Sequence, residues 1–404
     1  MKGIKHFIEK IKRRGIPGKR DSLMEGIMNG SRAFCGPEQL YIDLTNKCNL
    51  NCIACWHRSP LLDRKDIPPH WDTKHELPVD RVLSLIDEAE LMGVRKVICS
   101  GGGDPLLYKA LFDVLEYAAA KGFQILLVSN LTTADEKTIR RIVDSGVSQL
   151  LVNLWAGSPS AYTATHPGTT EGTFLRVRAL LRLFAEIRRG PFDPELVISN
   201  VVFSRNCEDV ENMVRLAIDV GASDIWFQTV DVERAEMKEL LLNAEQIKKL
   251  VNDLKVMKRA YSPLLEDYQR EMLNLEDFIE KLNSSRAPEG IYHADVIDKM
   301  PCYMGWAVCR IMANGDVVPC CKADKHPLGN ILNRSLSEIW NSERYNEFRK
   351  KAKGCSKTDP YFNKINCTKV CDNWWFNKII HKRYIEHIRG GSQGRRVRQD
   401  KENK

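Results

Sequence analysis

Residues 40–55 read Leu-Tyr-Ile-Asp-Leu-Thr-Asn-Lys-Cys-Asn-Leu-Asn-Cys-Ile-Ala-Cys and join an apolar strand to three closely spaced thiols. Spacings of four and three residues bring Cys48, Cys52 and Cys55 onto one loop, where they can face one metal ion or cluster. A structural zinc site would need a fourth ligand close by, whereas iron–sulfur clusters are also held by short-spaced cysteines. Since three thiolates leave one iron of a cluster open, we expect this loop to hold a cluster that takes a further ligand.

Apolar strands and amphipathic helices alternate after this loop. The expected strands cover residues 40–44, 94–99, 123–128, 147–154, 196–203 and 224–229, and the expected helices cover 78–92, 111–121, 134–145, 173–188 and 208–220. This alternation predicts a parallel sheet of βα units. Six strands are fewer than the eight of a closed barrel, so we expect a partial barrel or an open doubly wound sheet. In both folds, ligands bind at the carboxyl ends of the strands.

The rest of the chain does not continue this alternation of strands and helices. Residues 243–285 are helical and charged, which is typical of a linker. Beyond Met300, seven cysteines, a hairpin pattern around Asn314-Gly315 and a helix at 337–352 indicate a small cysteine-rich module. A module of about 80 residues needs a metal or a cluster to stabilise it. We divide the chain into a basic N-terminal extension (1–37), an α/β part (38–235), a helical linker (236–298), a cysteine-rich domain (299–376) and a basic tail (377–404).

The composition indicates a globular protein of a reducing compartment. The 404 residues are 43% hydrophobic and contain no apolar run long enough to span a membrane. Thirteen cysteines without a signal segment favour metal or redox use over disulfides, and a cytoplasmic location. The net charge of +8 concentrates in the ends, at about +7 in residues 1–20 and about +6 in residues 378–404. A basic helix expected at 2–14 could contact a membrane surface, whereas the few aromatic residues in both ends argue against nucleic acid.

The thiols of Cys48, Cys52 and Cys55 after the first strand, with a glycine-rich turn after the second, resemble the radical SAM superfamily. The resemblance covers residues 38–230. It implies a [4Fe–4S] cluster on the three thiols and S-adenosylmethionine (SAM) on the open iron. One-electron reduction would cleave SAM to methionine and a 5′-deoxyadenosyl radical, which takes a hydrogen atom from the substrate. The electron would come from a donor such as flavodoxin or ferredoxin.

The same resemblance implies contacts between SAM and the strand ends. The turn of Gly102, Gly103, Asp104 and Pro105 would bind the methionine ammonium group, with Asp104 where the family more often has glutamate. Glycine would allow the backbone to approach SAM closely. Ser129 stands at a strand end whose polar residues contact the ribose or the carboxylate in this family.

Two further residues are expected to lie near SAM. Asn153 ends another strand and is expected to contact SAM in the same way as Ser129. The family usually has an aromatic residue just before the third cysteine, near the adenine. Ala54 stands there in this chain, and Trp56, directly after the third cysteine, either replaces that aromatic residue or only packs.

The C-terminal cysteines resemble a SPASM or twitch domain, which carries one or two auxiliary [4Fe–4S] clusters. Gly315 stands five residues before Cys320, as in those domains. The expected ligands are Cys302, Cys320, Cys367 and Cys371, and Cys321 and Cys355 compete for one place. Because the closing pattern of a two-cluster domain is absent, we expect one auxiliary cluster. Two clusters with six ligands, or a zinc site with four cysteines, are the alternatives.

Together these observations predict an α/β protein with a partial (β/α)6 TIM-type barrel of parallel strands and a small C-terminal Cys-rich α+β cluster-binding domain. The predicted activity is radical SAM chemistry on a polar small molecule, such as a sugar, a cyclitol or a nucleotide-linked compound. The segment before the barrel is short for a peptide-recognition domain, so we place maturation of a ribosomally made peptide, by crosslinking or epimerisation, second. RNA modification and a zinc scaffold without activity are weaker alternatives. The sequence identifies no catalytic residue.

Overall fold

The computed structural model describes residues 21–190, 193–267, 274–293, 297–354, 359–367 and 369–402. The basic helix expected at 2–14 and the candidate ligand Cys355 lie outside these ranges.

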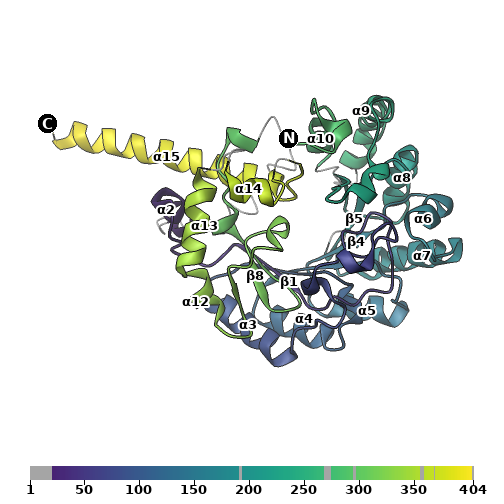
Figure 1. The fold of residues 1–404 in the computed structure, drawn as a ribbon, viewed down its shortest axis with the longest axis horizontal. Coiled ribbons are helices and arrows are strands. Elements are labelled where there is room, and N and C mark those ends of the chain that lie inside the picture. Colours follow the sequence, from purple (N-terminus) through teal and green to yellow (C-terminus); the bar gives the residue numbers. More distant parts are fainter. Residues whose placement is uncertain are drawn as a thin grey trace.

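Six parallel strands form the first part of the sheet, and helices follow them along the chain (Figure 1). The strands are β1 (Gln39–Asp43), β2 (Lys96–Ser100), β3 (Gln124–Ser129), β4 (Gln149–Asn153), β5 (Glu195–Val202) and β6 (Asp224–Thr229). The helices are α3 (Val79–Leu91), α4 (Leu111–Ala120), α5 (Glu136–Asp144), α6 (Pro159–Thr165), α7 (Glu171–Ile187) and α8 (Val210–Asp219). Each strand and helix expected between residues 40 and 229 lies within two residues of an observed one, and the predicted α/β fold with a mostly parallel sheet is confirmed.

The cysteine-rich part continues the same sheet. In the described chain the strand order is β6-β5-β4-β3-β2-β1-β7-β8-β9. Strand β7 (Val308–Ile311) pairs parallel to β1, and β8 (Asp316–Val318) and β9 (Gly329–Asn330) follow in antiparallel order. Gly315 has a φ of +86° in the β7–β8 turn, as the hairpin pattern predicts. The sequence showed the hairpin but not its pairing with β1, which lies far away in the chain.

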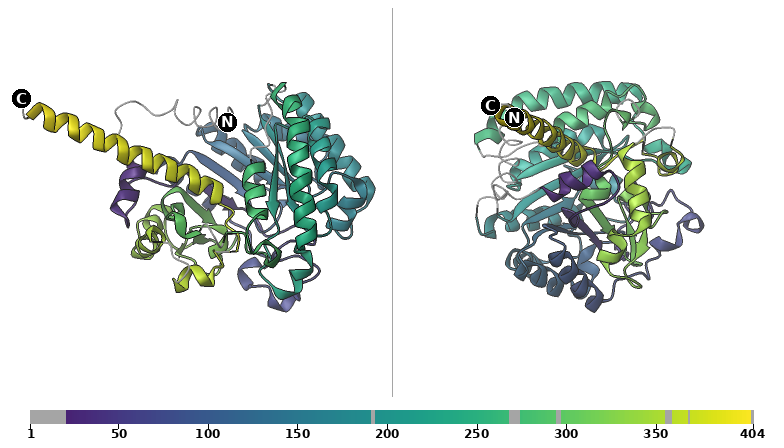
Figure 2. Two further views of the ribbon diagram at one scale, coloured as in Figure 1. Left: turned by 90° about the horizontal axis from the view of Figure 1, so that it is seen from above. Right: turned by 90° about the vertical axis from the view of Figure 1, so that its left-hand side faces the viewer.

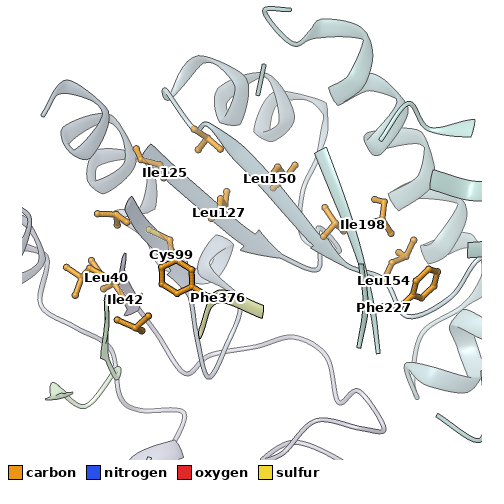
Figure 3. Close-up of a cluster of buried hydrophobic side chains, with 14 of the residues drawn as sticks. Leu40, Ile42, Cys99, Ile125, Leu127, Leu150, Leu154, Ile198, Phe227 and Phe376 are labelled. Carbon is orange, nitrogen blue, oxygen red and sulfur yellow. The ribbon is translucent and has the colours of Figure 1, made fainter. Parts of the chain in front are cut away.

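The strands of the barrel are buried on both faces, which explains why they are continuously apolar. Leu40, Ile42, Cys99, Ile125 and Ile198 belong to the main core, which also contains the apolar faces of the surrounding helices (Figure 3). A separate cluster on the strands contains Ile98, Leu126, Leu151 and Val197, with Tyr41 and Trp226 packed against it. Because side chains alternate along a strand, this second cluster faces the inside of the barrel.

Helices α9 (Ala244–Asp267) and α10 (Leu275–Leu282) lie in the segment predicted to be a helical linker, and α10 packs against β6. Asn274, which precedes α10, binds the free edge of β6 through its side-chain amide. Its Oδ1 accepts from the Phe227 N–H at 3.0 Å, and its Nδ2 donates to the Phe227 carbonyl at 2.5 Å. The side chain therefore takes the place of a neighbouring strand at this residue.

The prediction of one helix at 337–352 is wrong. Two helices occupy the segment, α12 (Leu336–Trp340) and α13 (Glu343–Lys353). They separate because the Ser342 hydroxyl accepts the Tyr345 N–H and begins a new helix.

The remaining helices complete the C-terminal part. They are α2 (Ser22–Asn29), α11 (Met304–Ala307), α14 (Pro360–Lys364) and α15 (Trp374–Glu402). Helix α15 includes most of the basic tail and runs outward from the rest of the molecule (Figure 2). None of the described helices is long and apolar enough to cross a membrane.

Candidate active site

The loop with the three cysteines begins directly after β1, at the carboxyl edge of the sheet. The Ile53 N–H donates to the Thr165 carbonyl at 3.0 Å, and the Ser59 hydroxyl donates to the Ile53 carbonyl at 2.5 Å. The first bond ties the middle of the loop to the end of α6, and the second closes the loop on itself.

The three thiols lie close enough to influence each other. Burial raises the pKa of Cys52, and the neighbouring Cys55 and Cys48 raise it further. Backbone N–H groups oppose the effect of burial on the pKa of all three thiols. Leu50 and Asn49 donate to Cys48, and His57 and Arg58 donate to Cys55. Hydrogen bonds to sulfur are typical of thiolates that ligate iron–sulfur clusters, so the loop fits a cluster.

Among the described residues no three His, Cys, Asp or Glu side chains converge closely enough to hold one metal ion. A cluster spreads its ligands over separate iron atoms and has no such requirement.

The glycine-rich turn after β2 packs against the chain that leads into Cys48. A Cβ on Gly103 would lie 1.9 Å from the Lys47 carbonyl oxygen, and one on Gly102 would lie 2.2 Å from Oδ1 of Asn46. The Asp104 N–H donates to the same Lys47 carbonyl at 2.8 Å. We predicted that glycine makes room for SAM, but the space beside both glycines belongs to the protein itself.

Asp104 joins the turn to the end of β3. Its buried carboxylate accepts from the Ser129 hydroxyl at 3.0 Å, the Asn130 N–H at 2.7 Å and the Leu106 N–H at 2.9 Å. Burial raises the pKa of Asp104, and these hydrogen bonds oppose the rise. Two residues that we expected to contact SAM separately are thus bound to each other. Binding of the methionine ammonium group by Asp104 stays a prediction, as does a contact of Asn153, which is half-buried at the end of β4.

An aromatic stack connects the cysteine loop to the cysteine-rich domain. The His57 ring stacks on Trp71 with 4.0 Å between centroids, and Nε2 of His57 lies 3.1 Å from the Gly102 carbonyl. Burial lowers the pKa of His57 to about 3, so the neutral ring donates to that carbonyl. Trp71 Nε1 and His70 Nε2 each lie 3.0 Å from Oδ2 of Asp324. This connection joins residues far apart in the chain, so no local pattern in the sequence indicates it.

Two tryptophans after strand ends lie in different surroundings. The Trp56 ring has the ammonium group of Lys322 at 5.4 Å from its centroid. Trp155 packs edge-on against Phe203, at 6.3 Å between centroids, in the cluster that also contains Ile53 and Ala54. A role of Trp56 near the adenine stays a prediction, since the ring already contacts a cation of the cysteine-rich domain.

The four cysteines predicted to bind the auxiliary cluster surround one cavity. Its lining includes Cys302, Cys320, Cys367 and Cys371, with apolar walls from Met300, Met304, Phe348, Phe362, Ile365 and Val370. Cys321 does not line this cavity, and its sulfur lies 2.9 Å from Oδ2 of Asp372. Backbone N–H groups of Lys322 and Ala323 donate to the Cys320 sulfur. The arrangement fits one cluster with four thiolate ligands, which favours this set over one containing Cys321.

Comparisons with known proteins agree with this geometry. Residues 42–217 match the radical SAM superfamily, and residues 302–371 match the SPASM iron–sulfur cluster-binding domain. A PqqA peptide cyclase of Xanthomonas campestris is 25% identical, with 82% of each chain covered. A protein of Pyrococcus furiosus that modifies the cofactor of tungsten-containing aldehyde ferredoxin oxidoreductase is 22% identical over 77% of this chain and 82% of its own. An AdoMet-dependent heme synthase of Methanosarcina barkeri is 24% identical over 78% of this chain and 85% of its own.

Solved structures show the same fold at lower identity. Streptococcus suis SuiB, bound to its precursor peptide SuiA, has a TM-score of 0.59 and 14% identity, with 92% of this chain and 83% of SuiB covered. The enzyme anSMEcpe with bound AdoMet has a TM-score of 0.56 and 16% identity, with 81% of this chain and 88% of that chain covered.

Proposed function

Because this chain is a radical SAM enzyme with a SPASM auxiliary-cluster domain, we propose that it matures a ribosomally made peptide by crosslinking or epimerisation. One observation carries the proposal. The match to the PqqA peptide cyclase covers 82% of both chains and therefore includes both the barrel and the cysteine-rich domain.

This proposal replaces a polar small molecule as the first choice. We preferred a sugar, a cyclitol or a nucleotide-linked compound because the segment before the barrel is short. That inference assumed that a peptide needs its own recognition domain. A peptide can also bind as an added strand or in a groove, through its own backbone. The relatives named for a tungsten enzyme cofactor and for heme synthesis keep a cofactor-like small molecule as the second candidate.

The protein's residues have separate tasks in this chemistry. When bound, the cluster and SAM supply a 5′-deoxyadenosyl radical that takes a hydrogen atom from the substrate. Cys48, Cys52 and Cys55 hold that cluster, and the turn at Gly102 and Gly103 fixes the start of their loop. Cys302, Cys320, Cys367 and Cys371, around the cavity of the cysteine-rich domain, would hold the auxiliary cluster.

The test begins with anaerobic reconstitution, which should load about eight irons per chain for two clusters. With dithionite as reductant, release of 5′-deoxyadenosine is measured with synthetic peptides encoded by short reading frames beside the gene. A matured peptide should lose two hydrogen atoms on crosslinking, or take up one deuterium from D₂O on epimerisation, as seen by mass spectrometry. Stimulation by a porphyrin, and by none of the peptides, would favour the second candidate instead.

Two variants control this experiment. Replacing Cys48, Cys52 and Cys55 with alanine should abolish SAM cleavage, and a triple variant that still cleaves SAM contradicts the assignment of the loop. Cys207→Ala, at a buried cysteine outside both cysteine sets, should cleave SAM as the unchanged protein does.

A further inference from the structure

Lys322 is a buried cation between the barrel and the cysteine-rich domain. Its ammonium group forms an ion pair with Asp231 and lies 2.7 Å from Oε1 of Glu233. The side chains of Lys322 and Asp231 are each only 3% exposed. Two carboxylates within ion-pair distance stabilise the charged form of Lys322. An ammonium group placed so deeply needs such partners.

The same residue belongs to the wall of the auxiliary-cluster cavity. Lys322 lines this cavity together with the four cysteines. Its backbone N–H donates to the Cys320 sulfur, and its positive charge favours the Cys320 thiolate. The positive charge therefore acts on at least one predicted ligand of the auxiliary cluster.

The other side of Lys322 faces the SAM-cluster loop. The ammonium group lies 5.4 Å from the centroid of the Trp56 ring, and Trp56 directly follows Cys55. Cation–π contact and the ion pairs hold the side chain in one place. Asp231, Glu233 and Trp56 thus hold the ammonium group of Lys322 in one place, and the same residue lines the auxiliary-cluster cavity.

We propose that the Lys322 ammonium raises the reduction potential of the auxiliary cluster. Reduction adds one negative charge to a cluster, and a positive charge fixed nearby in a medium of low dielectric constant stabilises that form. Net charge and hydrogen bonds to sulfur are what set the potentials of iron–sulfur clusters. Asp231 and Glu233 act in the opposite direction and limit the rise. The proposal rests on Cys302, Cys320, Cys367 and Cys371 as the ligands.

The test is a redox titration followed by electron paramagnetic resonance. It uses the full chain with Cys48, Cys52 and Cys55 changed to alanine, so that only the auxiliary cluster contributes a signal. In this background, Lys322→Met should lower the ratio of reduced to oxidised cluster about tenfold at a fixed potential. This corresponds to a midpoint about 59 mV lower for a one-electron couple.

Three further variants separate charge from structure. Lys322→Arg keeps the positive charge, so its ratio of reduced to oxidised cluster should stay within about threefold of that of the background protein. Glu233→Gln removes a negative charge and should raise the ratio. Lys325→Met removes an exposed charge from the same segment and should leave the ratio unchanged.

Each result decides the proposal. An unchanged ratio in Lys322→Met at full iron content overturns it, and so does a shift in Lys322→Arg as large as that in Lys322→Met. If Lys322→Met does not retain the cluster, the sign of the shift in Glu233→Gln decides, and no rise overturns the proposal. If the variant with Cys48, Cys52 and Cys55 changed to alanine holds no iron, the auxiliary ligand set is wrong, and the proposal fails with it. That result would not affect the proposed peptide substrate, which the assay with synthetic peptides tests separately.

Discussion

Gly103→Ala tests why the glycine-rich turn is needed. The added Cβ would lie 1.9 Å from the Lys47 carbonyl oxygen, more than 1 Å closer than real Cβ atoms come to their neighbours. This oxygen belongs to the backbone and also accepts the Asp104 N–H. It cannot move aside as a flexible side chain could, so the turn and the cysteine loop must separate.

The size of the effect follows from these two contacts. Overpacking of this kind costs about 1–3 kcal/mol, and a weakened buried hydrogen bond adds about 1 kcal/mol. We expect Gly103→Ala to lower the free energy of unfolding by about 2–4 kcal/mol in protein that holds neither cluster nor SAM. Because Lys47 precedes Cys48, iron after reconstitution should also fall from about eight toward about four per chain.

The assay is urea unfolding of the metal-free chain under anaerobic conditions, followed by iron analysis after reconstitution. Gly172→Ala is the matched control, since Gly172 lies in α7 and an added Cβ would find its nearest neighbour at 3.5 Å. Alanine there should raise stability by about 0.5–1 kcal/mol. If metal-free Gly103→Ala unfolds at the same urea concentration as the unchanged protein, yet no longer cleaves SAM, the glycine serves the ligand and our reasoning about the loop is wrong.

Three other predictions concern the surroundings of the two sites. Burial lowers the pKa of His166 to about 4 from its usual 6.5, so the unfolded chain binds the proton first and stability should fall by up to about 3 kcal/mol as the pH drops from above 6.5 toward 4. The stability of His166→Gln, measured by thermal unfolding, should depend less on pH than that of the unchanged protein. An equally steep dependence would mean that other groups cause the loss of stability at low pH. Cys371→Ser should lower iron from about eight to about four per chain while uncoupled SAM cleavage continues. Cys321→Ser should keep all of its iron, and loss of iron would make Cys321 a ligand. Asn274→Ala should lower the free energy of unfolding by about 1–3 kcal/mol, measured in urea, because the edge of β6 loses two hydrogen bonds at Phe227; an unchanged value would mean that water replaces the amide.

Local patterns in the sequence were sufficient for the barrel and for the cysteine sets. The six βα units follow from continuously apolar strands between amphipathic helices, a signal contained within each segment. The cysteines around the cavity of the cysteine-rich domain could be selected because Gly315 and Cys320 keep a family spacing. The two short helices on either side of Ser342 were read as one because their apolar residues continue the same periodicity.

Long-range contacts could not be predicted in this way. The pairing of β1 with β7 joins segments that lie far apart, and neither sequence carries a sign of its partner. The same holds for Asp324, which bonds to Trp71, and for Lys322, which bonds to Asp231. A lysine that follows two cysteines gives no indication that it will be buried, because only the folded chain supplies its counter-ions.

The place of β1 in the sheet has a consequence for how the protein is made. β1 ends at Asp43 and lies between β2 and β7, but β7 begins only at Val308. At about 5–20 residues per second, a ribosome needs on the order of tens of seconds to reach the missing neighbour. During this time the nascent chain has an open strand edge beside three unligated thiols, a state prone to aggregation and oxidation. The edge of β1 beside the cysteine loop is therefore covered only after residues 308–311 have been made, and iron delivery is expected to follow that step.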